Sequence, residues 1–272
     1  MTSSDKTGGM RMVADDRRFD RQTLVCSRKL QKGRNRWDQF SRTAPSIGSG
    51  ALQGPLLDFG CGAGYFLYEG LRRGFGLWGL DSRESKIRRY QHLIAYSGGP
   101  EHWRSRAVVA TGEDIPFASN TFSAVCSWYV LEHIHNPGQV IREWVRVLQP
   151  GGLLVIKAQD ARNGWEGHYK IPWPPFLSGS LSEAWLDVFG LKRTAEKDVV
   201  EVTQPQVECI LETLGCIVKR RAPEPKDLFP GMNALDTVIQ ARDAAERIKR
   251  QIDTGTWRPQ AENLFLWAIK PK

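Results

Sequence analysis

Short apolar bursts alternate with amphipathic stretches along most of the chain after residue 50. The bursts are too short for helices, which is typical of buried strands, and most are followed by a turn and a stretch with helical periodicity. The pattern predicts strands at Leu56–Phe59, Leu77–Leu80, Ala107–Ala110, Phe122–Tyr129 and Leu153–Lys157. Strands that alternate with helices at this spacing form a parallel sheet with helices on both faces, so we expect a doubly wound α/β fold.

Residues 159–180 break this rhythm, because the segment is dense in aromatic residues and prolines. A segment of this length inside a compact domain is usually functional or disordered, and this one is too aromatic for disorder. We therefore expect an aromatic lid over a site. Beyond it, the sequence predicts a helix near Pro205–Leu214, a strand at Cys216–Arg221, a helical insertion within residues 222–260 that includes Ala234–Ile252, and a final strand at Leu264–Ile269.

Residues 1–50 form a basic N-terminal arm, which we expect to be partly disordered or a helical cap on the domain of residues 51–272. The arm contains eleven Lys and Arg against five Asp, so it carries most of the net charge of +8. Residues 43–50 are rich in turn formers and are predicted to be a linker. The charge could steer an anionic partner, but its interleaving with acids favours a solvated arm.

The composition excludes several protein classes. A chain with 41% hydrophobic and 25% charged residues has the composition of a soluble globular protein. No apolar run approaches the roughly 18 residues of a membrane span, and the N-terminus has no secretion signal, so we expect a cytoplasmic protein. The five cysteines include no C-x-x-C pair, which argues against a disulfide framework and against a metal site.

The first predicted strand ends in a glycine-rich turn, Asp58-Phe59-Gly60-Cys61-Gly62-Ala63-Gly64. Its glycines allow a sharp bend and a close approach of backbone to ligand. A dinucleotide turn would place the third glycine one residue later. The carboxylate of Asp58 would also repel a pyrophosphate but attract an ammonium group. The turn therefore favours a cofactor with a zwitterionic amino-acid group over NAD.

Two further polar positions follow the next strands. Asp81 comes at the end of the second strand, about 20 residues after Gly60, where a carboxylate can bind both ribose hydroxyls. NAD would use it equally, so Asp81 indicates only a nucleoside. The loop Gly112-Glu113-Asp114-Ile115-Pro116-Phe117 combines polar and apolar groups and suits an adenine, although a surface turn is an equally good interpretation.

The glycine-rich turn, the acid at the second strand end and the polar loop after the third strand follow one another in an order that resembles the class I S-adenosylmethionine-dependent methyltransferases. The resemblance is specifically to the small-molecule kind called type 11. The resemblance runs from about Leu56 to Lys157 and rests on LDFGCGAG, the strand end at Asp81, GEDIPF, FSAVCSWYVLEHI and REWVRVLQPGG. It implies a Rossmann-like, doubly wound seven-stranded sheet, mostly parallel with an antiparallel last strand. It also implies S-adenosyl-L-methionine as the cofactor and S-adenosyl-L-homocysteine as the product.

The resemblance further implies roles for individual residues. The methionine part of the cofactor would be held by Asp58, Gly60, Cys61 and Gly62, the ribose by Asp81, and the adenine by Gly112, Glu113 and Asp114. Two positions depart from the family pattern. Ser123 stands where an Asp usually follows Phe, and Thr111 stands where an acid often precedes the adenine loop. The adenine contact is therefore less firmly indicated than the ribose contact.

A sulfonium methyl group is strongly electrophilic, so its transfer mainly requires alignment and exclusion of water. A general base is needed for a hydroxyl acceptor, whereas a neutral amine needs none. His133, at the end of the fourth strand, is the first candidate for the base, and a structural role for it is an equally good interpretation. His168 in the aromatic segment is the second candidate. We expect surface positions for His92, His102 and His135.

Candidate acceptor-binding residues are placed at strand ends and in the aromatic segment: Tyr129, Asp160, Trp165, Tyr169 and Trp173. They suggest an apolar or ring-bearing acceptor, although core packing explains some of the aromatic residues. The leading hypothesis is methyl transfer to a hydroxyl or amine of a small molecule, such as a natural product, a sugar or a lipid-like compound. The alternatives are a nucleic-acid methyltransferase that uses the basic arm, for which no RNA-binding module is evident, and a non-catalytic binding protein for the cofactor. A monomer or a homodimer is expected.

Overall fold

The computed structural model describes residues 8–163, 165–166, 169–173, 177, 179–192, 200–220, 250, 254 and 264–272. Two predictions fall largely or wholly outside these residues. The helical insertion within residues 222–260 is represented only by Arg250 and Thr254, and His168 lies outside the described residues.

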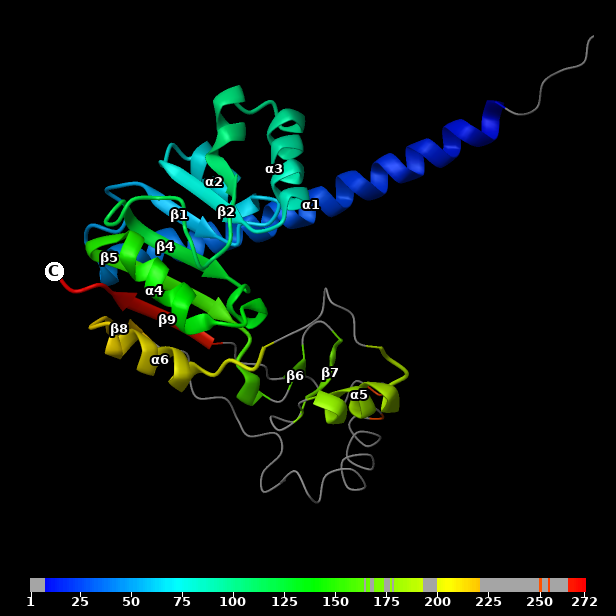
Figure 1. The fold of residues 1–272 in the computed structure, drawn as a ribbon. Coiled ribbons are helices and arrows are strands. Elements are labelled where there is room, and N and C mark those ends of the chain that lie inside the picture. Colours follow the sequence, from blue (N-terminus) through cyan, green and yellow to red (C-terminus); the bar gives the residue numbers. More distant parts are fainter. Residues whose placement is uncertain are drawn as a thin grey trace, which may run out of the picture.

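A seven-stranded sheet forms the centre of the fold, in the order β3-β2-β1-β4-β5-β9-β8 (Figure 1). The bounds of its strands are Leu56–Phe59 for β1, Leu77–Asp81 for β2, Ala107–Val109 for β3, Phe122–Trp128 for β4, Leu148–Ala158 for β5, Ile217–Arg220 for β8 and Leu264–Ile269 for β9. Strands β1 to β5 are parallel, whereas β9 is antiparallel to both of its neighbours, β5 and β8. The mostly parallel sheet with an antiparallel last strand is therefore confirmed.

Strand β5 begins earlier than its sequence predicts. Leu148, which precedes the predicted strand Leu153–Lys157, pairs with Phe122 of β4, and the register then shifts before Leu153 pairs with Ala124. Gly151 allows this irregular stretch because its φ of 73° lies in the left-handed region that glycine tolerates. The stretch Pro150-Gly151-Gly152 is thus an irregularity within the strand.

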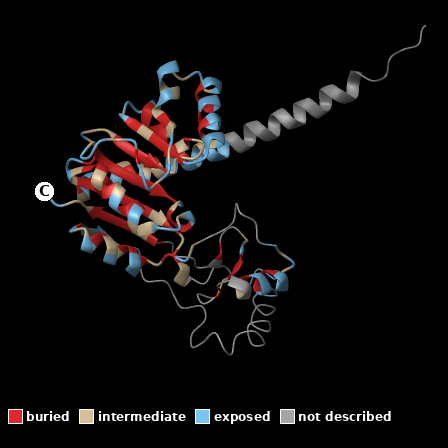
Figure 2. Cartoon of the chain, in the orientation of Figure 1, coloured by how far each residue is buried: buried red, intermediate tan, exposed pale blue. Residues whose placement is uncertain are grey.

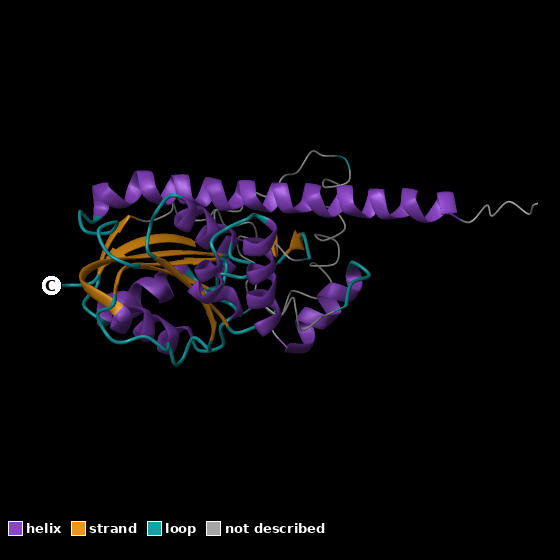
Figure 3. Ribbon diagram, turned by 90° about the horizontal axis from the view of Figure 1, so that it is seen from above, coloured by secondary structure: helices purple, strands orange, loops and turns teal. Residues whose placement is uncertain are grey.

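Helices cover both faces of the sheet (Figure 3). One face carries α1 (Gly8–Ile47), α2 (Tyr65–Arg72) and α3 (Glu84–Tyr96), and the other carries α4 (Pro137–Val147) and α6 (Gln204–Thr213). Short 3-10 helices are η1 (Glu101–Arg106), η2 (Leu131–His133) and η3 (Ala161–Asn163). The sheet is buried between these layers (Figure 2). Among the described helices, none has the length and apolar character needed to cross a membrane.

The basic arm contains one long helix, α1, whose second half packs into the core. The predicted linker at residues 43–50 is helical as far as Ile47, with Pro45 in the last turn of the helix. Trp37, Phe40 and Ala44 are buried at the spacing of one helix face. A Cβ atom on Gly33 would lie 2.4 Å from the carbonyl oxygen of Tyr65, so only glycine permits this close approach of α1 to α2.

The last strand also contacts this helix. The ring of Phe40 stacks on that of Trp267 in β9, with centroids 6.3 Å apart and an interplanar angle of 13°. Both side chains are fully buried. Helix α1 and strand β9, far apart in the sequence, therefore share one core.

The described part of the aromatic segment folds on itself beyond the end of β5 (Figure 1). It contains the hairpin of β6 (Trp165–Glu166) and β7 (Ile171–Pro172), which is followed by α5 (Gly179–Val188). The indole N–H of Trp185 donates to the carbonyl oxygen of Pro172 at 2.8 Å. Together with Trp185, the residues Ile171, Leu177 and Leu186 form a small core of their own.

Candidate functional site

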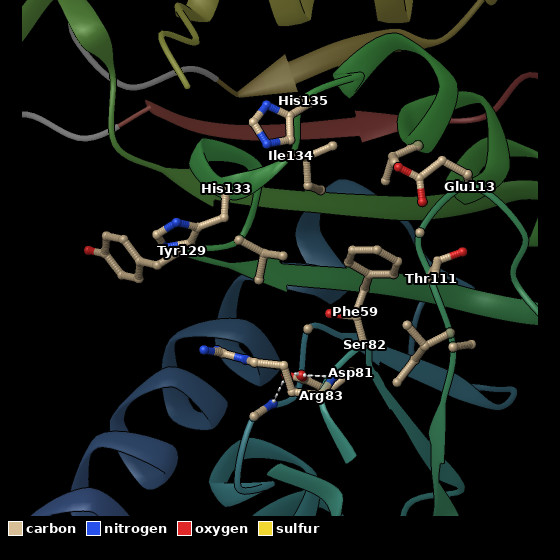
Figure 4. Close-up of a pocket in the computed structure, with 17 residues that line it drawn as sticks. Phe59, Asp81, Ser82, Arg83, Thr111, Glu113, Tyr129, His133, Ile134 and His135 are labelled. Carbon is tan, nitrogen blue, oxygen red and sulfur yellow. Dashed lines mark hydrogen bonds and ion pairs between the residues drawn. The ribbon is translucent and has the colours of Figure 1, made fainter. Parts of the chain in front are cut away.

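A cavity of about 610 Å³ opens at the carboxyl ends of β1, β2 and β4 (Figure 4). Its walls come from the segments that follow these strands and β3, and include Phe59, Gly60, Gly62, Leu80, Asp81, Ser82, Arg83, Ala110, Thr111, Gly112, Glu113, Tyr129, Val130, His133, Ile134, His135 and Val140. Ligands of open α/β sheets bind at this edge, where the strand order reverses between β1 and β4. The volume lies within the range of about 300–1,000 Å³ that is common for small-molecule sites.

The three glycines of the turn after β1 all have left-handed backbone conformations, but only one faces open space. A Cβ atom on Gly60 would lie 2.3 Å from a methyl carbon of Val130, and one on Gly64 would lie 2.2 Å from the ring of Tyr90. Gly62, with φ of 58°, has no atom within 4 Å of that position. The backbone at Gly62 is therefore open to a ligand in the cavity, whereas Gly60 and Gly64 are required by packing.

Asp81 fixes the turn after β2 to the glycine turn after β1. Its Oδ2 accepts a hydrogen bond from the backbone N–H of Gly62 at 3.0 Å, and its Oδ1 accepts one from the N–H of Arg83 at 2.9 Å. The guanidinium Nε of Arg83 lies 3.8 Å from the same Oδ1. The side chain is largely buried yet lies on the cavity wall. A carboxylate oxygen can accept more than one hydrogen bond, so Asp81 keeps acceptor capacity for a ligand.

Asp58 and Cys61 lie behind the turn and do not line the cavity. The carboxylate of Asp58 accepts a hydrogen bond from the backbone N–H of Leu67 in α2, and its burial raises its pKa from 3.8 to about 7 even though Arg36 opposes the shift. The thiol of Cys61 packs against Gly79, where a Cβ atom would lie 2.9 Å from Sγ, and burial raises the pKa of this thiol. Neither residue is part of the cavity wall. That Asp58 and Cys61 hold the methionine part of the cofactor therefore stays a prediction.

The loop expected at the adenine reaches the cavity through Thr111, Gly112 and Glu113, whereas Asp114 is exposed outside it. Gly112 is required by packing, since a Cβ atom there would lie 2.8 Å from the ring of Phe59. Ser123, the other departure from the family pattern, is not among the residues of the cavity wall. Its hydroxyl is buried and donates to the carbonyl oxygens of Ala51 and Pro55 at 3.1 Å.

Two residues of α4 hold this loop, a role that sequence reasoning did not assign. Glu143 accepts a hydrogen bond from the backbone N–H of Ile115 at 3.0 Å, and the guanidinium of Arg146 donates to the carbonyl oxygens of Ile115 and Phe117, both at 2.9 Å. Glu143 and Arg146 also pair with each other at 2.7 Å. Both belong to the segment REWVRVLQPGG, so the ion pair and its contacts with the loop account for two of the polar residues in that segment.

Tyr129 and His133 both line the cavity and lie toward one end of it in Figure 4, whereas Glu113 and Thr111 lie toward the other end. Tyr129 has φ of 60°, a left-handed conformation that is rare for an aromatic residue. Its backbone N–H donates to the carbonyl oxygen of Lys157, which fixes this conformation at the end of β4. His133 is exposed on η2, and His135, expected only at the surface, is exposed and also lines the cavity.

Two cations approach the ring of Tyr129, and sequence reasoning missed both. The guanidinium carbon of Arg36 lies 5.5 Å from the ring centroid and the ammonium nitrogen of Lys157 lies 5.7 Å from it. Arg36 comes from α1 and Lys157 from β5. No sequence spacing connects them, because the sheet and the long helix bring them together.

Among the described side chains, three other predicted acceptor-binding residues, Asp160, Tyr169 and Trp173, do not line the cavity. Asp160 is buried, and its carboxylate accepts hydrogen bonds from Arg162 and from the backbone N–H of Gln204 at 2.9 Å, which ties β5 to the start of α6. This places Asp160 in a structural role. The rings of Tyr169 and Trp173 stack on each other 6.4 Å apart, and Trp165 lies in β6. Within the described residues, no cluster of His, Cys, Asp and Glu could hold a metal ion.

Comparisons with known proteins agree with this geometry. Residues 57–156 match the family described as "Methyltransferase domain". An uncharacterized methyltransferase of Mycobacterium marinum is 35% identical over 129 residues, which cover 47% of this chain and 48% of the relative. The demethylmenaquinone methyltransferase of Thermobifida fusca is 29% identical over 194 residues, covering 64% of this chain and 79% of the relative.

A solved structure gives the same fold. Phosphoethanolamine N-methyltransferase 2 of Haemonchus contortus, in complex with S-adenosyl-L-methionine, superposes with a TM-score of 0.53 at 18% identity, over 87% of this chain and 53% of that chain. The family match confirms the resemblance found in the sequence. The chain spans about half or less of the length of the first curated relatives it matches.

Proposed function

We propose that this chain, whose folded domain is that of a class I S-adenosylmethionine-dependent methyltransferase, transfers a methyl group to a hydroxyl or amine of a small-molecule acceptor. The observation that carries the proposal is the pairing of an open glycine backbone at Gly62 with the buried carboxylate of Asp81 on one cavity wall. The match to residues 57–156 supports the reaction class.

The residues of the cavity fit the cofactor. Asp81 supplies carboxylate oxygens for ribose hydroxyls, as acids at this position do in nucleoside-binding sheets. Phe59, Leu80 and Val140 supply an apolar wall for an adenine, and the backbone at Gly62 leaves room for the amino-acid part. When bound, S-adenosyl-L-methionine supplies an electrophilic methyl group on a sulfonium.

The acceptor side of the site is assigned to Tyr129 and His133. Both line the same cavity, at the end opposite Glu113 (Figure 4). The ring of Tyr129 offers an apolar surface against which a ring-bearing acceptor can pack, while exclusion of water and alignment favour transfer. His133 is the base that would take the proton from a hydroxyl acceptor, a contribution of about 10²–10⁴ in rate. The Thermobifida fusca relative is named for demethylmenaquinone, which is a ring-bearing compound.

The test is transfer of labelled methyl from S-adenosyl-L-methionine to fractionated metabolites and to phenols and amines of low molecular mass. We expect label in a small-molecule fraction, with S-adenosyl-L-homocysteine as the co-product. His133→Gln should lower kcat and leave cofactor affinity unchanged. His92→Gln, at an exposed position on α3 outside the cavity wall, is the matched control and should change neither.

The result that would overturn the proposal is cofactor binding without transfer to any fraction, which would identify a non-catalytic binding protein. Label found in RNA or DNA alone would instead identify a nucleic-acid methyltransferase.

A further inference from the structure

Two cations lie against the ring of Tyr129, a residue of the cavity wall, although neither cation is itself part of that wall. The centroid of the Tyr129 ring lies 5.5 Å from the guanidinium carbon of Arg36 and 5.7 Å from the ammonium nitrogen of Lys157. Arg36 also lies 5.8 Å from the ring of Trp128, and Lys157 lies 5.0 Å from that of Phe265. The aromatic rings therefore hold both cations in place without neutralising them.

Among the described residues, no acid forms an ion pair with either cation. In the part of the chain that the structure describes, the ion pairs involve other residues, and neither Arg36 nor Lys157 has a carboxylate within ion-pair distance. Arg36 interacts electrostatically with Asp58, a carboxyl group buried behind the glycine turn, and burial raises the pKa of Asp58 to about 7.

Holding two like charges together in a half-buried position costs free energy. Burial and the nearby Arg36 lower the pKa of Lys157, so its ammonium form is disfavoured in this position. Long basic side chains usually extend their charged ends into water, yet the charged ends of these two lie close to the ring of Tyr129. An anion bound between them would remove the repulsion.

We propose that the methyl acceptor carries a compact oxyanion, a carboxylate or phosphate group, which Arg36 of α1 and Lys157 of β5 bind beside Tyr129. This inference rests on the proposed function, since it names the chemical class of that acceptor. It also gives the basic arm a defined role, because α1 delivers Arg36 to the site. Arginine suits this role, since its fork of N–H donors matches the oxygens of either group.

The test uses the full chain saturated with S-adenosyl-L-homocysteine. Phenyl phosphate, benzoate and the neutral compound phenol are titrated into it by calorimetry at low ionic strength. We expect at least one of the two anions to bind about tenfold or more tightly than phenol. Arg36→Gln and Lys157→Gln should each weaken anion binding by about tenfold and leave phenol binding unchanged.

Matched controls separate this site from the general charge of the arm. Arg28→Gln and Lys32→Gln remove exposed charges from the same helix and should leave anion binding within twofold of the wild type. Thermal unfolding of each variant shows that the fold is intact, and Arg36→Lys, which retains the charge, should recover part of the affinity.

Two results would overturn the inference: anions that bind no better than phenol, or anion binding that Arg36→Gln and Lys157→Gln leave intact. Failure of the proposed function would look different. In that case labelled methyl would reach no small-molecule fraction, whether or not S-adenosyl-L-homocysteine and the anions bind.

Discussion

Replacement of Asp81 by Asn tests the assignment of the cofactor site, because it removes the charge and keeps the shape. Asp81 accepts hydrogen bonds from the N–H groups of Gly62 and Arg83. An amide has one acceptor oxygen, so one of these N–H groups would lose its partner, at a cost of about 1–3 kcal/mol in the free energy of unfolding. A lost charge-assisted hydrogen bond to a ribose hydroxyl would weaken cofactor binding by about 1.5–3 kcal/mol, which is about tenfold to a hundredfold in Kd.

Titration calorimetry with S-adenosyl-L-methionine measures this change in Kd, and thermal unfolding without ligand measures the change in stability. Glu84→Gln is the matched control, because Glu84 pairs with Arg88 on the exposed face of α3, where an ion pair contributes about 0–1 kcal/mol. It should leave cofactor affinity unchanged. If Asp81→Asn binds the cofactor as tightly as the wild type does, the assignment of Asp81 to the ribose is refuted.

Three further predictions follow from the same geometry. Gly60→Ala should lower the melting temperature strongly, because the added Cβ would clash with Val130. Gly62→Ala should cost only about 1–2 kcal/mol of backbone strain and mainly raise the Kd for the cofactor. Equal melting temperatures for the two variants would contradict this prediction. As pH rises from 3.8 to about 7, the unfolded wild-type chain releases the proton of Asp58 while the folded chain retains it, so the wild type loses up to about 4 kcal/mol of its free energy of unfolding. Asp58→Asn has no such proton and should not show this loss. Curves of unfolding free energy against pH that are parallel for the two proteins would refute this prediction. Tyr129→Asn, which tolerates the left-handed backbone, should preserve the melting temperature and raise the KM for the acceptor, and an unchanged KM would remove Tyr129 from the acceptor site.

The fold could be predicted from the sequence because each strand has its own local signal. The burst at Leu56–Phe59, its glycine turn and the acid at Asp81 are all short-range patterns, and the parallel arrangement follows from the alternation with helices. The end of α1 was predicted wrongly. Pro45 and its neighbours favour a turn locally, but the burial of Phe40 and Ala44 against the sheet extends the helix to Ile47.

The site was predictable only where its residues follow strand ends. Gly62, Asp81, Gly112 and Glu113 line the cavity as the sequence suggested. Asp160 also follows a strand, yet its carboxylate is used by Arg162 and the start of α6, a contact that depends on how distant segments pack.

Arg36 shows the opposite case, because nothing near it in the sequence marks it as part of a site. Its position depends on the close contact of Gly33 with Tyr65, which sets α1 against α2. A side chain placed by such a contact can be found only from the three-dimensional structure.

The contact between Phe40 and Trp267 has a consequence for the synthesis of this protein. Strand β9 lies between β5 and β8, so the sheet cannot close until residues 264–269 have left the ribosome. At translation rates of about 5–20 residues per second, Trp267 is synthesised on the order of ten seconds or more after Phe40, its partner in helix α1. During that interval the nascent chain exposes Phe40 and the unpaired edge of β5, the kind of surface that chaperones bind.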